Sequence, residues 1–299
     1  MIRGLSVWTA RVVVLAMAFG LVVAAPAGAA TEKRYKDELF EVKVKRDITY
    51  GLAPADQYGE RQELKLDLYR PKGDTLRKRP VAIWVHGGGF ANGDKAVGTS
   101  PVLARKFASM GYVSASINYR LLARQGCNGS NGVTQECYDA AIEAVHDAQA
   151  SVRWMRTNRK QLRIDPKRIA IGGESAGAIA ANGVAVLSAD PGESGNPGVS
   201  SAVQGFVSIS GGLPGGIFVD ENTAPGLLFA STDDPIVPYS WSVETRDKME
   251  SFDVPVKLTT FQSNVHVPFV EFRKKIEKQS TNLLYKYLGL KIGVAEAAF

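Results

Sequence analysis

The stretch of sequence that decides the fold is Arg168-Ile169-Ala170-Ile171-Gly172-Gly173-Glu174-Ser175-Ala176-Gly177-Ala178. An apolar run ends in two glycines, and small helix-forming residues follow the serine. This order predicts a strand, a sharp turn and a helix, with Ser175 at the apex. A residue on so tight a turn has strained backbone angles, and glycine at Gly173 and Gly177 removes the Cβ atoms that would clash there. The five residues from Gly173 to Gly177 therefore fit the Gly-x-Ser-x-Gly nucleophile elbow, which raises a serine hydroxyl above a sheet and beside a helix N-terminus.

A second cluster of glycines, His86-Gly87-Gly88-Gly89, directly follows the apolar run Val81-Ala82-Ile83-Trp84-Val85. A run that is apolar at every position is typical of a strand covered on both faces. Consecutive glycines leave their backbone N–H groups uncovered, and a motif of this kind forms one wall of an oxyanion hole. Each cluster alone is also typical of an ordinary turn or flexible loop. Their occurrence in one chain, in this order, favours a catalytic site.

A serine nucleophile needs a base, and the base needs an acid that orients it. The chain has three histidines: His86 in the glycine cluster, His146 in the middle of a predicted helix, and His266. His266 follows the last predicted strand by a short loop and comes after Ser175, so position and elimination both indicate that it is the base. The acid should follow the preceding strand, where Asp233-Asp234 stands. Either aspartate gives the chain order serine, acid, histidine that accompanies an elbow.

The remaining patterns predict an α/β fold. Residues 40–49 and 64–68 alternate between apolar and charged side chains, which predicts an antiparallel pair of strands at a sheet edge. Apolar runs then alternate with helical patterns, as expected of a mostly parallel, doubly wound sheet. We find no internal repeat or linker. The later strands are predicted at 81–85, 112–117, 168–171, 205–210, 226–230 and 254–260, and the helices at 101–110, 139–156, 176–187, 239–250 and 268–288.

Residues 1–30 have the composition of a signal peptide. Arg3 and Arg11 give a positive start, residues 12–23 are apolar, and Ala27-Gly28-Ala29 resembles a cleavage site. An uncleaved membrane anchor is the alternative, but Pro26 and Gly28 make a poor end to a membrane helix. We therefore expect a signal peptide over 1–30, a catalytic domain over 31–299, and a secreted, periplasmic or otherwise extracytoplasmic protein without stable membrane insertion after cleavage.

Composition and cysteine count narrow the class further. The chain is 45% hydrophobic and 22% charged with a net charge of +6, as in an ordinary globular protein. Its basic residues are scattered and form no stripe with interleaved aromatics, so we expect no nucleic-acid partner. Cys127 and Cys137 suggest a disulfide in an exported chain, with two free thiols as the alternative if residues 1–30 are not a signal. No second cysteine pair or histidine cluster accompanies them, so we expect no metal, and no organic cofactor is implied.

On these motifs the chain resembles the α/β-hydrolase family. It is most similar to bacterial esterases and lipases with His-Gly-Gly-Gly and Gly-x-Ser-Ala-Gly motifs, the hormone-sensitive-lipase-like group and its carboxylesterase relatives. The resemblance covers essentially the whole mature chain. It implies an α/β-hydrolase fold and an acyl-enzyme mechanism on carboxylic esters. It also implies an oxyanion hole made by the backbone N–H groups of Gly88, Gly89 and Ala176.

The same resemblance assigns the catalytic roles. Ser175 is then the nucleophile, His266 the base and Asp234 the orienting acid. Asp234 is preferred because family members carry the acid just before the proline of a sequence like Asp-Pro-Ile-Val-Pro, and Asp233 stays the alternative. Glu174, at the variable position of the elbow, is expected to be a structural hydrogen-bond acceptor.

Two departures from the family pattern bear on the substrate. Tyr119-Arg120-Leu121-Leu122-Ala123-Arg124 stands where the group has Tyr-Arg-Leu-Ala-Pro-Glu, and only residues 211–225 separate two core strands where many relatives insert a lid. We therefore expect little or no cap and an open or shallow site. The main hypothesis is a secreted serine esterase for short-chain or small aryl esters. The alternatives are a deacetylase or feruloyl-type esterase acting on acylated polysaccharide, a peptidase or acyltransferase, and a non-catalytic binding protein on a hydrolase fold.

Overall fold

The structure is a computed structural model that describes Met1 and residues 33–54, 61–122 and 126–290. The signal peptide predicted over 1–30 and its cleavage site lie outside the described residues, apart from Met1. The architecture below is that of residues 33–290.

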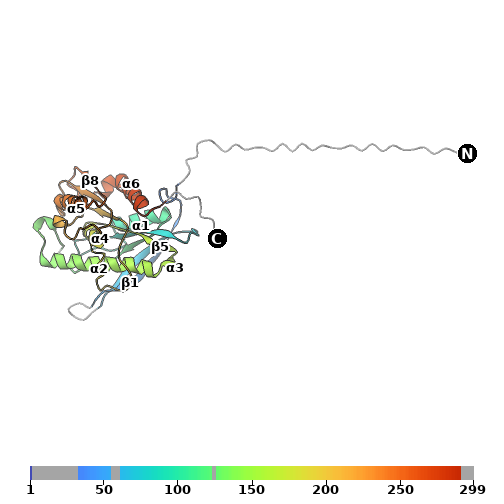
Figure 1. Ribbon diagram of the computed structural model, residues 1–299, viewed down its shortest axis with the longest axis horizontal. Helices are drawn as coiled ribbons and strands as arrows, with labels where there is room; N and C mark the ends of the chain where they lie inside the picture. Colours follow the sequence, from blue (N-terminus) through green and yellow to red (C-terminus); the bar gives the residue numbers. More distant parts are fainter. Residues whose placement is uncertain (2–32, 55–60, 123–125, 291–299) are drawn as a thin grey trace. The chain divides into compact units, whose positions relative to one another are not determined.

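Eight strands in this part of the chain form one sheet in the order β1-β2-β4-β3-β5-β6-β7-β8. Figure 1 shows this sheet with the helices packed around it. β2 pairs antiparallel with both β1 and β4, and every later neighbour is parallel. The prediction of a mostly parallel sheet with an antiparallel start is confirmed. The strands are β1 (Val42–Leu52), β2 (Glu63–Pro71), β3 (Arg79–Val85), β4 (Val113–Ile117), β5 (Ile164–Glu174), β6 (Phe206–Ile209), β7 (Gly226–Ser231) and β8 (Val256–Phe261).

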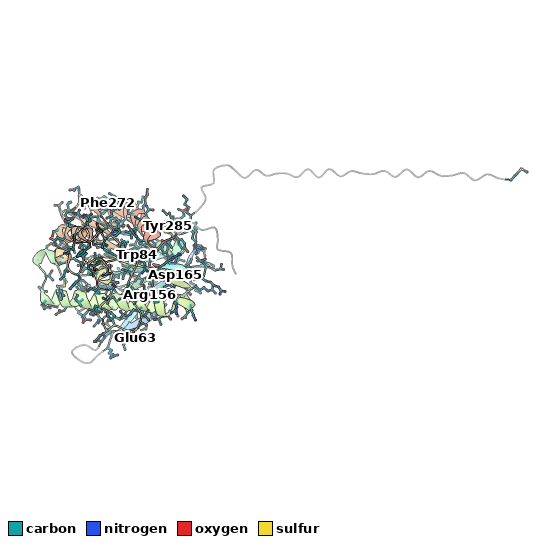
Figure 2. All side chains as sticks on the ribbon, viewed as in Figure 1. Glu63, Trp84, Arg156, Asp165, Phe272 and Tyr285 are labelled. Carbon is teal, nitrogen blue, oxygen red and sulfur yellow. A yellow bond between two sulfur atoms is a disulfide. The ribbon has the colours of Figure 1, made fainter. Side chains whose placement is uncertain are left out.

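Helices cover both faces of the sheet. In β3, which is buried throughout, Ile83 belongs to the apolar core under α2 and α4, whereas Trp84 belongs to the core under α1 and α6. Trp84 packs on Phe107 of α1 with 5.2 Å between ring centroids, deep in the interior (Figure 2). The helices are α1 (Thr99–Ser109), α2 (Gln135–Thr157), α3 (Arg159–Leu162), α4 (Ala176–Val186), α5 (Tyr239–Ser251) and α6 (Phe269–Tyr287), with short 3-10 turns η1 (Gly129–Asn131) and η2 (Pro214–Gly216).

The long helix α2 begins earlier than its apolar pattern predicts. The pattern places the start at residue 139, whereas the helix begins at Gln135. Thr134 explains the difference, because its Oγ1 accepts a hydrogen bond from the backbone N–H of Cys137 at 3.2 Å and so caps the first turn. Among the described helices, none is long and apolar enough to cross a membrane.

Candidate active site

Ser175 lies between the last residue of β5 and the first residue of α4. Its φ of 53° and ψ of −125° are unusual for a residue with a side chain. The flanking glycines make this turn possible. A Cβ on Gly177 would lie 2.2 Å from the carbonyl oxygen of Val85, and one on Gly173 would lie 2.3 Å from the carbonyl oxygen of Gly177. The elbow therefore requires glycine at both positions, as the sequence pattern predicts.

Three side chains predicted to act together form one chain of hydrogen bonds. His266 Nε2 lies 2.7 Å from Ser175 Oγ, and His266 Nδ1 lies 2.8 and 3.0 Å from the two carboxylate oxygens of Asp234. The three residues follow β5, β7 and β8, so they meet where parallel strands end at the same edge of the sheet. Asp233, the alternative acid, is exposed and accepts a hydrogen bond from Thr232 instead.

The Asp234 carboxylate is fixed in its ionised form. Its side chain is only 2% exposed, and burial acts to raise its pKa. Hydrogen bonds from His266 and from the backbone N–H groups of Ile236 and Val237 outweigh burial and lower the pKa of Asp234 below its ordinary value. Both N–H groups donate to the same oxygen, at 2.9 and 3.0 Å. The carboxylate can therefore orient the imidazole and stabilise it when it is protonated.

The predicted oxyanion donors have free N–H groups. Gly88 and Gly89 have φ values of 119° and 60°, and a Cβ on Gly88 would lie 2.0 Å from the carbonyl oxygen of Asn92. Ala176 is the first residue of α4. Within the described residues, the backbone N–H groups of Gly88, Gly89 and Ala176 donate to no other group. All three remain available to an acceptor beside Ser175.

His86 supports the glycine loop and takes no part in the hydrogen-bond chain at Ser175. It is buried, its ring stacks on Tyr119 with 4.5 Å between centroids, and its Nδ1 donates to the carbonyl oxygen of Gly87 at 2.7 Å. The Tyr119 hydroxyl in turn donates to the carbonyl oxygen of His86 at 3.1 Å. Burial lowers the pKa of His86, so a neutral imidazole is favoured there.

Glu174 is a hydrogen-bond acceptor for the neighbouring helix. Its Oε1 accepts the backbone N–H of Thr99, the first residue of α1, at 3.0 Å. The N-cap residue of α1 is Gly98, which has no side chain to cap the helix. A carboxylate near a helix N-terminus is favoured by the helix dipole. The interaction ties the elbow to α1.

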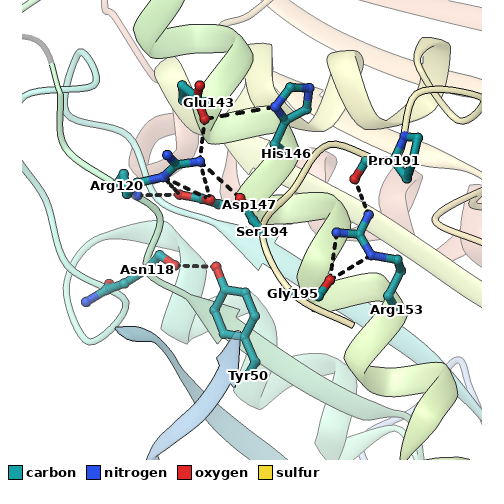
Figure 3. Close-up of polar contacts among 10 residues, drawn as sticks. All are labelled: Tyr50, Asn118, Arg120, Glu143, His146, Asp147, Arg153, Pro191, Ser194 and Gly195. Atoms are coloured by element: carbon teal, nitrogen blue, oxygen red, sulfur yellow. Dashed lines mark hydrogen bonds and ion pairs between the residues drawn. The ribbon is translucent and has the colours of Figure 1, made fainter. Parts of the chain in front are cut away.

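A polar cluster on α2 fixes the segment that follows β4 (Figure 3). Arg120 pairs with Glu143 and with Asp147, whose side chain is fully buried, and its backbone N–H donates to Asp147 Oδ2 at 2.8 Å. Its guanidinium also donates to Ser194 at 3.0 Å. Because Arg120 directly follows Tyr119, this cluster anchors the residue that holds the glycine loop.

Sequence reasoning did not assign these roles to Arg120 or its partners. The only signal in the sequence was a Tyr-Arg pair one residue after a strand. Its acidic partners come from a helix more than twenty residues later. His146 belongs to this region: its ring lies 3.9 Å from Glu143 and 3.7 Å from Asp190, and it is not part of the group at Ser175. Among the described residues, no cluster of histidine, cysteine or acidic side chains is arranged to hold a metal ion.

An apolar pocket opens beside the oxyanion donors. Gly89 and Ala176 form part of its wall, and none of the described residues that line it carries a charge. The predicted disulfide between Cys127 and Cys137 is present, and both cysteines line the pocket. Helices and loops after β6 and β7 complete the lining with Leu213, Val237 and Trp241.

Part of this chain is similar in sequence to known proteins. The BD-FAE family model matches residues 66–196. The chain is 34% identical over 119 residues to lipase 2 of Geotrichum candidum, and 29% identical over 147 residues to secreted lipase 5 of Gibberella zeae. These matches cover 39% and 46% of this chain but only 21% and 27% of the relatives, so the chain matches about a quarter or less of their length.

Among solved structures, the native esterase Est2 of Thermogutta terrifontis superposes with a TM-score of 0.66 at 19% identity, over 87% of this chain and 95% of that one. The fold is that of the α/β-hydrolases. The match to the BD-FAE family model lies within that fold and spans less than half of the chain.

Proposed function

We propose that the protein is a carboxylic ester hydrolase that works through an acyl-enzyme on Ser175. The observation that carries the proposal is the continuous chain of hydrogen bonds from Ser175 Oγ through His266 to Asp234, at 2.7 and 2.8 Å. This is the geometry that activates a serine hydroxyl. The names of the two sequence relatives, both lipases, support the same class of reaction.

The mechanism follows from the positions of these groups. Ser175 Oγ attacks the ester carbonyl carbon while His266 Nε2 takes the hydroxyl proton. The carbonyl oxygen becomes an oxyanion, and the free N–H groups beside the serine stabilise it, at about 3 to 4 kcal/mol for each donor. His266 then gives its proton to the departing alcohol, which leaves an acyl group on Ser175. Water then attacks the acyl carbonyl carbon and gives a proton to His266 Nε2, which returns a proton to Ser175 Oγ as the acid is released. Asp234 holds the imidazole throughout.

The lining of the pocket favours ester groups that are small and uncharged. Its described lining is free of charged side chains, so an apolar acyl or aryl group is favoured over a charged one. We therefore propose short-chain or small aryl esters as substrates. Aromatic lining from Phe90, Tyr138 and Trp241 also suits an aromatic acyl group whose alcohol stays outside the pocket, as in an ester-linked polysaccharide.

The disulfide supports a site of action outside the cytoplasm, since such bonds persist in oxidising compartments. We propose export by cleavage of residues 1–30. Sequencing the N-terminus of the protein recovered from a secreting host tests this, with Ala30 or Thr31 expected as the first residue. An N-terminus at Met1 on exported protein would contradict it.

Hydrolysis of 4-nitrophenyl esters, from acetate to palmitate, tests the activity with the mature protein and with Ser175→Ala. We expect turnover of the short esters and a loss of about 10⁶-fold in kcat for the variant. Acetylated and feruloylated polysaccharides form the second arm, and turnover there alone would favour the polysaccharide esterase. Equal activity of both proteins would show that Ser175 is not the nucleophile. Binding of esters without turnover by either protein would favour a non-catalytic role.

A further inference from the structure

The segment closed by the disulfide, residues 127–137, forms one wall of the apolar pocket; we name it the disulfide loop. Both half-cystines line the pocket, together with Asn128, Gly129 and Val133 from between them. The loop carries η1 and ends in the first turn of α2. Sequence analysis assigned this segment a disulfide but no part in the site.

The disulfide loop contacts both sides of the candidate active site. The backbone N–H of Cys127 donates to the carbonyl oxygen of Gly89, in the glycine loop, at 3.0 Å. The backbone N–H of Ser130 donates to the carbonyl oxygen of Ile236 at 3.3 Å, two residues after Asp234. The loop therefore spans from one oxyanion donor to the loop that carries the acid.

The loop also packs directly against Trp241 of α5. A Cβ on Gly129 would lie 2.5 Å from the Trp241 ring and 2.9 Å from Pro238 Cδ, so the backbone at Gly129 packs closely against this ring. Trp241 lines the pocket as well. The disulfide loop and the Trp241 indole therefore meet at the wall of the pocket, and the position of the loop fixes one of its boundaries.

The two ends of the loop are held in different ways. The hydrogen bond from Cys127 to Gly89 holds one end, and the other end continues into α2, whose first turn is capped by Thr134. The disulfide joins these two ends covalently. Breaking it leaves a segment with little buried side-chain area to hold it, since Gly129, Ser130 and Val133 belong to neither core cluster.

We propose that the disulfide loop and Trp241 are the specificity-determining wall of the pocket, and that the intact Cys127–Cys137 bond sets the size of ester group the enzyme turns over. The proposal rests on the proposed esterase function. Ser175 and His266 make no hydrogen bond to the loop. Opening the loop therefore removes contacts with ester groups that fill the pocket. It leaves the catalytic groups, and so the bond-breaking steps, largely unchanged.

Reduction of the wild-type protein tests the proposal without any substitution. The chain has two cysteines, and both are in this bond, so a reductant has one target. We expect dithiothreitol to raise KM for 4-nitrophenyl hexanoate and benzoate, with a loss of about tenfold in kcat/KM, and to change kcat/KM for the acetate less than about threefold. A second series of acetate esters with alcohols of increasing bulk shows the same effect if the alcohol occupies the pocket. Cys127→Ser/Cys137→Ser should match reduced wild type and be indifferent to dithiothreitol.

Two glycines in the region provide a matched pair of variants. Gly129→Ala places a methyl group against Trp241, whereas Gly126→Ala places one where no atom lies within 4 Å. In the oxidised protein, we expect Gly129→Ala to change how kcat/KM depends on the size of the ester group (the size profile). We expect Gly126→Ala to leave this dependence unchanged. Circular dichroism at the assay temperature establishes that each protein is folded.

The possible outcomes separate the two claims. An active wild type, an inactive Ser175→Ala and a size profile indifferent to reduction and to Gly129→Ala would overturn the specificity proposal alone. An equal loss on small and large esters would also overturn it, because the loop would then act on the catalytic groups. A wild type inactive on every ester in both redox states would contradict the proposed function itself.

Discussion

The two halves of the candidate site are built by different means. The first half, within the family match at 66–196, consists of the glycine loop and the elbow, and backbone geometry dictates its residue types. Gly87 is an example, because a Cβ there would lie 3.1 Å from the Cβ of Ser175. The second half lies beyond residue 196 and supplies Asp234 and His266 from loops after β7 and β8. Positions where the backbone requires glycine therefore form a motif that is easily recognised in the sequence. A catalytic side chain in a loop after a strand is recognised only by its order along the chain.

Apart from removal of Ser175 itself, the largest effect is expected in the second half, where adjacent aspartates provide a matched pair. Asp234→Asn keeps the shape but removes the charge that holds His266 Nδ1–H, and we expect kcat to fall by about 10⁴-fold. Asp233→Asn, at an exposed position, should change kcat less than about threefold. Ester hydrolysis at pH 7.5 measures both. A larger loss for Asp233→Asn than for Asp234→Asn would show that Asp233 is the acid, and would contradict the comparison.

A smaller effect is expected from the backbone of the first half. Gly177→Ala forces a methyl group to within 2.2 Å of the Val85 carbonyl oxygen, so the elbow must shift. We expect a loss of about 1 to 3 kcal/mol in the free energy of unfolding, and reduced kcat from displaced oxyanion donors. Gly205→Ala is the control, since its nearest atom lies at an ordinary 3.5 Å. Urea unfolding of both variants measures the difference, and equal stabilities would mean that the elbow tolerates a side chain.

The smallest effect is a pH dependence from His86, which supports the first half. Burial lowers the pKa of His86 in the folded protein, so the unfolded chain takes up the proton first as the pH falls. Neutral His86 therefore contributes to the free energy of unfolding above pH about 6.5, the pKa of histidine in the unfolded chain. This contribution is lost as the pH falls toward the lower pKa of His86 in the folded protein, and it amounts to about 1.4 kcal/mol for each unit by which burial lowers that pKa. Wild type should therefore lose more stability than His86→Gln between pH 7.5 and 5.5. Parallel stability curves for the two proteins would contradict a neutral, buried His86.

The sequence predicted much of the fold because the hydrophobic pattern of most segments matches the helix or strand that each one forms. The run at 81–85 is a buried strand, and the alternating runs near the N-terminus form the antiparallel pair. It also predicted which residues meet at Ser175, since strand order brings the loops to one edge. It could not predict the pocket wall, because the contact between Gly129 and Trp241 joins residues more than 100 positions apart with no shared pattern. It did not predict the Arg120 cluster either, because no sequence pattern pairs this arginine with acidic residues of a helix more than twenty positions later.

The central claim is that Ser175 is an activated nucleophile, and covalent labelling tests it most directly. An aryl organophosphate loses its aryl alcohol when an activated serine oxygen attacks phosphorus, so the protein gains the mass of one phosphoryl group. Intact-mass measurement followed by peptide mapping locates that group. We predict one adduct per chain, on the peptide that contains Ser175, and none on Ser175→Ala. An adduct on another residue, or equal labelling of Ser175→Ala, would contradict the mechanism.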